Sequence, residues 1–249
     1  MFSNPKTDPK TILLTGGTAG IGLALFKQLR SQGHTLIVVA RNQEKLASLQ
    51  SSYSNVITYP CDLSSRLAVE SLCEKITQSH PELSIVINNA GIQYTPTFLD
   101  DDFSFDSIEH ETRVNLLAPV WLAYLLLPGL IEFKKPAAII NISSGLIFAP
   151  KTNSAIYCAT KAAIHSFSQS LRYQLATTNI HVIEAIMPLV DTTMTAGRGS
   201  GKISPESAAQ QIIHGINCNR SEIYVGKTKI LPLLMRLLPS LVKRIMKRL

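Results

Sequence analysis

Short runs of β-branched and apolar residues alternate along the chain with longer stretches in which apolar residues recur at helical spacing. Seven short runs are predicted strands, the last of them the weakest: Thr11–Thr15, Thr35–Val39, Asn55–Tyr59, Ser84–Asn88, Ala137–Ser143, Ile180–Ile186 and Glu222–Val225. Helical stretches between them include Ile21–Ser31, Arg66–Ser79 and Ser154–Thr178. Strands that lack polar alternation and are followed by helices are typical of a parallel sheet covered on both faces. The pattern predicts an α/β fold with a doubly wound sheet of about seven parallel strands, and a ligand site at the strands' carboxyl ends.

The longest uncharged run extends from Val114 to Ile131 and barely reaches the length that spans a bilayer. Asn115, Pro119 and Pro128 interrupt it. We therefore expect a helix buried in the core or at a subunit interface rather than a membrane span.

With 249 residues, of which 45% are hydrophobic, the chain can bury a large core, and no linker, repeat or low-complexity tract divides it. The four cysteines lie far apart without a CxxC pair, and the first ten residues are polar without an apolar signal segment. We expect reduced thiols and a cytoplasmic protein. The six histidines show no ligand spacing, so we expect no metal site.

The net charge of +7 belongs to the C-terminal tail. From Lys227 onward the chain has seven basic residues and no acidic one: Lys227, Lys229, Arg236, Lys243, Arg244, Lys247 and Arg248. The other 17 basic residues balance the 17 acidic ones, and a neutral body argues against a nucleic-acid partner.

Apolar residues recur through this tail between the basic ones, and Pro232 and Pro239 are predicted to begin two short helices. A basic amphipathic helix can lie on an anionic membrane surface, which would make the protein membrane-peripheral. The alternative is a segment that packs against another subunit or covers the substrate cleft.

A glycine-rich turn follows the first strand directly and opens a helix. Within Thr15–Gly22 the glycines have the spacing G-x3-G-x-G, and the turn consists of Gly16, Gly17, Thr18, Ala19, Gly20, Ile21 and Gly22. Glycines let the backbone approach a pyrophosphate, while a helix N-terminus offers free N–H groups and partial positive charge. A tight structural turn is the alternative, but the strand–turn–helix context favours dinucleotide binding.

The end of the second strand bears on which dinucleotide is bound. An NAD-preferring site usually has Asp or Glu there to accept a hydrogen bond from the ribose 2′-hydroxyl. Here Ala40 leaves room for a 2′-phosphate and Arg41 can bind it, unless Arg41 is simply a solvated charge. The sequence favours NADP(H) over NAD(H).

Tyr157 and Lys161 lie four residues apart on a predicted helix and therefore share one face. A neighbouring cation favours the phenolate and lowers a tyrosine pKa from its usual value of about 10. The spacing alone is weak, because such pairs occur by chance on exposed helices.

Together with the glycine turn, Asn88–Gly91 and Ser144, this pair gives the chain the motif order of the short-chain dehydrogenase/reductase family, which it resembles from about Thr11 to Thr192. The resemblance implies one NAD(P)-binding Rossmann-fold domain over residues 1–226, a C-terminal extension over 227–249, and a homodimer or homotetramer. Short phrases such as that at residues 222–226 resemble the branch named after the D-alanyl-lipoteichoic acid operon, a name that establishes no substrate.

The resemblance implies that Tyr157 is the general acid/base and that Lys161 lowers its pKa and holds the nicotinamide ribose. Ser144, which is favoured over Ser143 by its distance from the tyrosine, would bind the substrate oxygen. Asn115 would support a water-linked proton path; without the family it reads as a helix residue that satisfies a backbone group.

Further positions are expected to contact the cofactor by the same resemblance: Asp62 and Leu63 at the adenine, Asn89, Ala90 and Gly91 along its length, and Val190 and Thr192 at the nicotinamide. One departure is clear, because Met187 and Pro188 stand where the family usually has Pro and Gly. Proline cannot take a positive φ, so we expect a different backbone there. The glycine-rich segment over residues 193–204 resembles a short lid.

The sequence therefore predicts an NADP(H)-dependent oxidoreductase that transfers hydride between nicotinamide and a small carbonyl/alcohol substrate. The alternative is a catalytically silent NADP(H)-binding redox sensor on the same fold.

Overall fold

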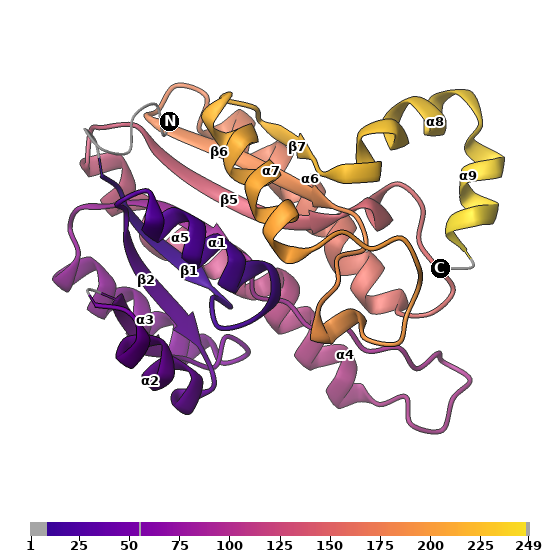
Figure 1. Ribbon diagram of the computed structural model, residues 1–249, viewed down its shortest axis with the longest axis horizontal. Coiled ribbons are helices and arrows are strands. Elements are labelled where there is room, and N and C mark those ends of the chain that lie inside the picture. Colours follow the sequence, from indigo (N-terminus) through magenta and orange to yellow (C-terminus); the bar gives the residue numbers. More distant parts are fainter. Residues whose placement is uncertain (1–8, 55, 248–249) are drawn as a thin grey trace.

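Seven parallel strands form one sheet at the centre of the computed structural model, which describes residues 9–54 and 56–247 (Figure 1). Their order is β3-β2-β1-β4-β5-β6-β7. The bounds are β1 (Thr11–Thr15), β2 (Thr35–Ala40), β3 (Val56–Pro60), β4 (Leu83–Asn88), β5 (Ala137–Ser144), β6 (Ile180–Met187) and β7 (Glu222–Tyr224). The predicted fold class and all seven predicted strands are confirmed, with ends that shift by at most one residue; Asn55 lies outside the described residues.

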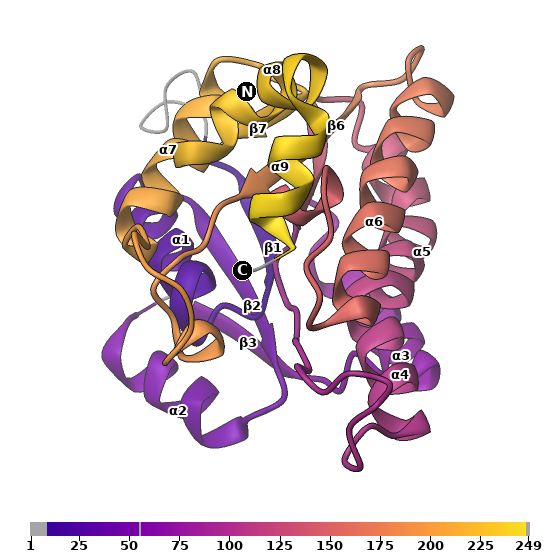
Figure 2. The same ribbon diagram turned by 90° about the vertical axis from the view of Figure 1, so that its right-hand side faces the viewer.

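Helices cover both faces of the sheet, and each face has its own apolar core. The helices α1 (Gly20–Ser31), α2 (Gln43–Ser52) and α7 (Pro205–Asn217) pack on one face. The helices α3 (Arg66–Ser79), α5 (Ala118–Glu132) and α6 (Ala155–Gln174) pack on the other. Figure 2 shows α1 and α7 on one side of the strands and α5 and α6 on the opposite side.

The long apolar segment lies against this second core. It continues from α4 (Phe105–Thr112) through a π-helical turn, η1 (Arg113–Leu117), into α5. Among the described residues, this stretch is the one helix long and apolar enough to cross a membrane by length and composition. Its residues Leu122, Leu126 and Leu130 are buried in the second core, as expected for a core helix.

Polar side chains fix the register near the centre of the sheet. Asn88 on β4 pairs with Asn141 on β5, and its Nδ2 donates to the Asn141 Oδ1 at 2.8 Å. The Asn141 amide then donates to the Ser168 hydroxyl on α6 at 2.8 Å. This buried chain ties β4, β5 and α6 together directly below the ends of the strands.

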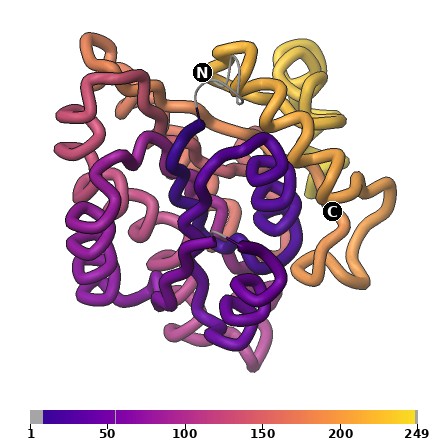
Figure 3. The backbone as a smooth tube through the Cα atoms, turned by 60° about the vertical axis from the view of Figure 1, so that its left-hand side comes forward, coloured from indigo at the N-terminus to yellow at the C-terminus, as the bar shows by residue number. Residues whose placement is uncertain are grey.

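After β7 the chain turns away from the sheet as η4 (Gly226–Ile230), α8 (Leu231–Leu237) and α9 (Pro239–Met246). The two short helices are as predicted, with Pro232 and Pro239 in their first turns. The segment that follows β6 and this C-terminal part lie on the same side of the molecule (Figure 3).

Candidate active site

The glycine turn at the end of β1 has a conformation that requires glycine. Gly16 and Gly20 have φ values of +69° and +52°. A Cβ atom on Gly22 would collide with the carbonyl oxygen of Gly16. Ala19, the N-cap of α1, makes no side-chain capping bond, so the first N–H groups of the helix remain available to an anion.

The end of β4 is bonded to this turn. The Asn89 Nδ2 donates to the carbonyl oxygens of Thr15 at 2.9 Å and Gly16 at 3.2 Å. The Thr15 hydroxyl accepts from the backbone N–H groups of Asn89 and Ala90, both at 3.0 Å. Two segments 74 residues apart therefore form one rigid rim at the point where β1 and β4 separate.

A cavity of about 340 Å³ runs along this rim. Twelve of the predicted cofactor residues line it: Gly16, Thr18, Ala19, Gly20, Ile21, Gly22, Arg41, Leu63, Asn89, Ala90, Gly91 and Thr192. A glycine floor, free helix N–H groups and a guanidinium at one end suit a phosphorylated dinucleotide. The residues present therefore fit a nicotinamide dinucleotide.

Asp62 is placed differently from its neighbour. Its Oδ1 accepts from the backbone N–H and the hydroxyl of Ser64 at 3.0 and 2.8 Å, so it closes the turn before α3. Leu63 is among the lining residues of the cavity and Asp62 is not.

Lys161 is buried beneath Tyr157 on α6, with 6% of its surface exposed. Its Nζ donates to the carbonyl oxygen of Ile142 at 2.8 Å and lies 5.6 Å from the centroid of the Tyr157 ring. Burial lowers the pKa of Lys161 to about 8, against the opposing charges of Glu184 and Glu111. The predicted sharing of one helix face is confirmed.

The acid strength of Tyr157 differs from the expectation. Burial raises its pKa to about 12, and the Cys158 thiol acts in the same direction. A hydrogen bond with Ser144 and the charge of Arg198 oppose the shift, but burial outweighs both. In the protein alone, Tyr157 is therefore a neutral phenol at pH 7.

Asn115 lies in the π-helical turn and binds the backbone. Its Oδ1 accepts from the N–H of Ile92 at 2.9 Å and its Nδ2 donates to the carbonyl oxygen of Ile92 at 2.8 Å. A Cβ on Gly91 would lie 3.4 Å from this Oδ1 and 3.8 Å from the Lys161 Nζ. The side chain thus fixes the loop after β4 beside the lysine, and it is not among the cavity-lining residues.

Two buried carboxylates beside this group were missed by sequence reasoning. Glu111 is 2% exposed, and its Oε1 accepts from the N–H of Tyr94 at 3.1 Å; burial raises its pKa to about 7. Glu184 is 1% exposed and lies 2.7 Å from the Nδ1 of His165. Their spacing could have indicated them. Glu111 lies four residues before Asn115, and His165, the partner of Glu184, lies four residues after Lys161, so each pair shares a helix face.

A second cavity of about 440 Å³ adjoins the first, and both are lined by Ile21, Asn89, Gly91, Thr192 and Met194. It is predominantly apolar, and the predicted residues Ser144, Tyr157, Lys161 and Val190 line it. Residues of the predicted lid, among them Arg198 and Gly199, and of the C-terminal helices complete its wall. The candidate catalytic groups Ser144, Tyr157 and Lys161 therefore line an apolar cavity that adjoins the glycine-lined one.

The backbone after β6 accommodates the unusual proline. Pro188 is not among the residues with positive φ; instead Gly226 takes +56° close to the Pro188 ring. Val190 pairs with Ile203 in an isolated bridge that closes the lid segment at its base. Thr192 lies against the glycine turn, because a Cβ on Gly20 would be 3.1 Å from the Cγ2 of Thr192.

The same chain resembles known oxidoreductases. Residues 10–202 match the short chain dehydrogenase family. The uncharacterized oxidoreductase DltE of Bacillus subtilis is 38% identical over 224 residues, with 88% of each chain covered. A fatty acyl-CoA reductase of Acinetobacter baylyi is 34% identical over 215 residues, which are 83% of this chain and 72% of that protein.

Among solved structures, a short-chain dehydrogenase from Sphingobium yanoikuyae in complex with NADPH has a TM-score of 0.79 and 25% sequence identity. The likeness covers 86% of this chain and 87% of that one. These relatives agree with the resemblance, and with the branch, that the motifs indicated.

Proposed function

Because the chain belongs to the short-chain dehydrogenase family, we propose that it is an NADP(H)-dependent reductase that acts on an apolar carbonyl compound. The oxidoreductase class follows from the family; the cofactor preference, the catalytic residues and the substrate are our proposal. The observation that carries it is that Ser144, Tyr157 and Lys161 together line an apolar cavity that adjoins the candidate cofactor cavity.

The reductive direction suits the protonation states of the site. Bound nicotinamide supplies the hydride. Tyr157, whose pKa is raised to about 12, holds its proton at neutral pH and donates it to the developing alkoxide. Ser144 donates a hydrogen bond to the same oxygen and stabilises the charge that forms there. Lys161 is anchored by Ile142 at the far side of the tyrosine, where it can hold the ribose hydroxyls.

The preference for the phosphorylated cofactor rests on the end of β2. Arg41 lines the cofactor cavity and is exposed, with its Nη1 3.3 Å from the Nε2 of His110. The residue before it is Ala40, so the site lacks the carboxylate that an NAD-preferring site has there and that would repel a 2′-phosphate. The NADPH-bound relative supports the same preference.

The substrate proposal rests on the second cavity. Its surface is mostly apolar, with Leu146, Leu189, Leu231 and Ile245 among the side chains that line it. The relative named as a fatty acyl-CoA reductase supports an aliphatic carbonyl compound in the same place.

The test is NADPH oxidation, followed by absorbance, over aldehydes and ketones of increasing chain length. We expect Tyr157→Phe to lower kcat by about 10²–10⁴-fold with NADPH binding retained. Tyr173→Phe is the matched control, because that tyrosine lies on the same helix and is exposed. Tight NADPH binding without turnover of any carbonyl would favour the redox-sensor alternative.

The cofactor preference is tested separately with Arg41→Ala. We expect the KM for NADPH to rise by at least about tenfold while the KM for NADH stays unchanged, since a phosphate–guanidinium pair is lost. Arg66→Ala, on the exposed surface of α3, should change neither value. Equal use of both cofactors by the unchanged protein would contradict the preference.

A further inference from the structure

The last described part of the chain, residues 227–247, forms an arm that is attached to the body by few buried side chains. No residue of α8 is buried, and in α9 only Val242 is. Figure 1 shows the two helices projecting from the end of the sheet. The apolar residues of this C-terminal arm therefore contribute little to the core.

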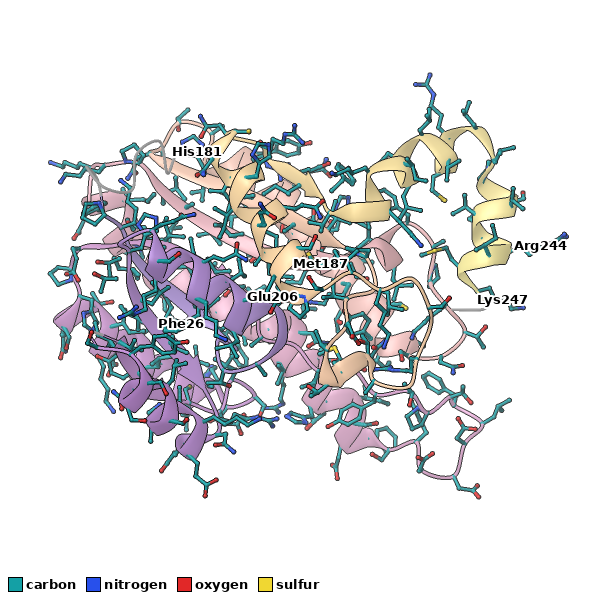
Figure 4. All side chains as sticks on the ribbon, viewed as in Figure 1. Phe26, His181, Met187, Glu206, Arg244 and Lys247 are labelled. Carbon is teal, nitrogen blue, oxygen red and sulfur yellow. The ribbon has the colours of Figure 1, made fainter. Side chains whose placement is uncertain are left out.

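The arm exposes apolar and basic side chains together. Six apolar side chains are exposed over about half or more of their surface: Ile230, Leu233, Leu237, Leu238, Leu241 and Ile245. Six basic residues of the arm are exposed as well: Lys227, Lys229, Arg236, Lys243, Arg244 and Lys247. In Figure 4 the side chains of Arg244 and Lys247 point away from the body. No acidic residue follows Lys227 in the sequence to balance this charge.

The same arm forms the outer wall of the apolar cavity. Leu231, Ile245 and Met246 line the cavity beside the catalytic residues. The carbonyl oxygen of Lys247 accepts from the backbone N–H and the hydroxyl of Thr152 at 3.1 and 2.9 Å, which holds the end of the arm over the cavity. Ile245 is both 55% exposed and part of the lining, so it lies at the rim.

We propose that the C-terminal arm docks on an anionic membrane surface and that the substrate is an amphiphilic carbonyl compound taken from the lipid phase. Exposed leucines would insert at the boundary of headgroups and acyl chains, while lysines and arginines bind anionic headgroups. A membrane in contact with the arm lies at the rim of the cavity, so an aliphatic chain can pass between them without crossing water.

The charge of the arm favours a membrane surface over a second copy of the chain as its binding partner. Two arms packed face to face would bring together two uncompensated basic clusters, whereas the rest of the chain is neutral and offers no acidic excess to pair with them. An anionic lipid surface supplies the opposite charge and the apolar layer at once.

The binding half of the proposal is tested by co-sedimentation of the full-length protein with vesicles. We expect binding to phosphatidylcholine vesicles that contain about 30% phosphatidylglycerol, weak binding to phosphatidylcholine alone, and release at about 1 M salt. Leu237→Asp with Leu241→Asp, and separately Lys243→Glu with Arg244→Glu, should each weaken binding at least about tenfold. Leu67→Asp, on the exposed surface of α3, is the matched control and should change nothing.

Sedimentation needs no turnover, so its outcome does not depend on the proposed reductase activity. Only the proposal about the substrate rests on that proposed function. Absence of binding to the anionic vesicles would overturn the membrane proposal even if the enzyme reduces soluble carbonyls. A further outcome would contradict the proposal: the parent binds no vesicles, and the Leu237→Asp, Leu241→Asp variant has a smaller particle mass than the parent. The arm would then be a contact between two copies of the chain.

The substrate half is tested by presenting a long-chain aldehyde within the same vesicles. We expect the parent protein to reduce it and the arm variants to lose at least about tenfold of that rate while reducing short, water-soluble aldehydes as before. Equal rates for the parent and the arm variants on the vesicle-borne aldehyde would overturn delivery from the lipid phase.

Discussion

At the scale of single residues, the site contains a carboxyl group that the fold keeps away from water. Glu111 lies near the end of α4, and its Oε1 accepts a hydrogen bond from the backbone N–H of Tyr94. This bond and the charge of Lys161 both act to lower its pKa. Burial favours the protonated acid, which is why its pKa rises from 4.5 to about 7. The folded protein therefore binds a proton at Glu111 that the unfolded chain has released.

This linkage predicts the pH dependence of stability. Between pH 4.5 and about 7 the folded state holds more protons at this group than the unfolded chain, so its contribution to the free energy of unfolding falls as the pH rises through that window. Glu111→Gln keeps the acceptor for Tyr94 and removes the charge. We expect it to stabilise the protein by roughly 1–3 kcal/mol at pH 8 and by almost nothing at pH 4.

Urea unfolding at the two pH values measures the effect. Glu109→Gln is the control, because that side chain lies on the same helix and is 69% exposed. A Glu111→Gln protein that is less stable than the parent at pH 8 would show that attraction to the charge of Lys161 outweighs burial.

Residues whose chemistry is local could be predicted from the sequence. Tyr157 and Lys161 are recognisable because their i, i+4 spacing guarantees a shared face whatever the helix packs against. The pKa of Tyr157 could not be predicted, since the raised value follows from how deeply the fold buries the phenol, which the spacing to Lys161 does not show. Asp62 shows the same limit: the sequence places it beside the adenine pocket, but only the turn geometry sends its carboxylate to Ser64.

At the scale of elements, the sheet could be predicted because each strand is a short apolar run between helices. A parallel strand buried on both faces shows this run whichever strand it pairs with. The π-helical turn at residues 113–117 could not be predicted. The run from Val114 to Ile131 is apolar almost throughout, so the extra residue of such a turn shifts no visible periodicity. Asn115 occupies this turn, so its bonds to Ile92 were also beyond the sequence.

A substitution in the glycine turn after β1 tests how closely the backbone must pack there. Gly22→Ala would drive a methyl group into the backbone carbonyl of Gly16 and into the side-chain amide of Asn89, which is itself hydrogen-bonded to the backbone of the turn. We expect the variant to lose at least about 2 kcal/mol of stability, or to bind NADPH at least about tenfold more weakly. Fluorescence titration with NADPH and thermal unfolding measure the two effects.

Gly129→Ala is the matched control for this variant. Gly129 lies inside α5, and a Cβ there meets no atom within 4 Å. Alanine should therefore be neutral or stabilise by up to about 1 kcal/mol, as expected for a helix interior. If Gly22→Ala behaves like Gly129→Ala, close backbone packing is not what the turn requires.

At the scale of the whole molecule, two of the apolar surfaces on the described residues lie on different elements. One is the C-terminal arm. The other is the outer side of α5, which has no charged residue before Glu132 and exposes Tyr124 at 77%, with Trp121 and Leu125 partly exposed beside it. Unlike the arm, this side of α5 carries no excess charge, so a second copy can pack against it without repulsion.

We therefore expect a particle of at least twice 27.3 kDa in solution, held together through α5. Tyr124→Lys should convert it to the monomer, because two lysines would face each other across a symmetric contact. Light scattering behind size exclusion measures the mass, and Tyr173→Lys on the exposed side of α6 serves as control. Vesicle binding should survive in the Tyr124→Lys monomer, since the arm is a separate surface; its loss would mean that the arm binds only when two copies present it together.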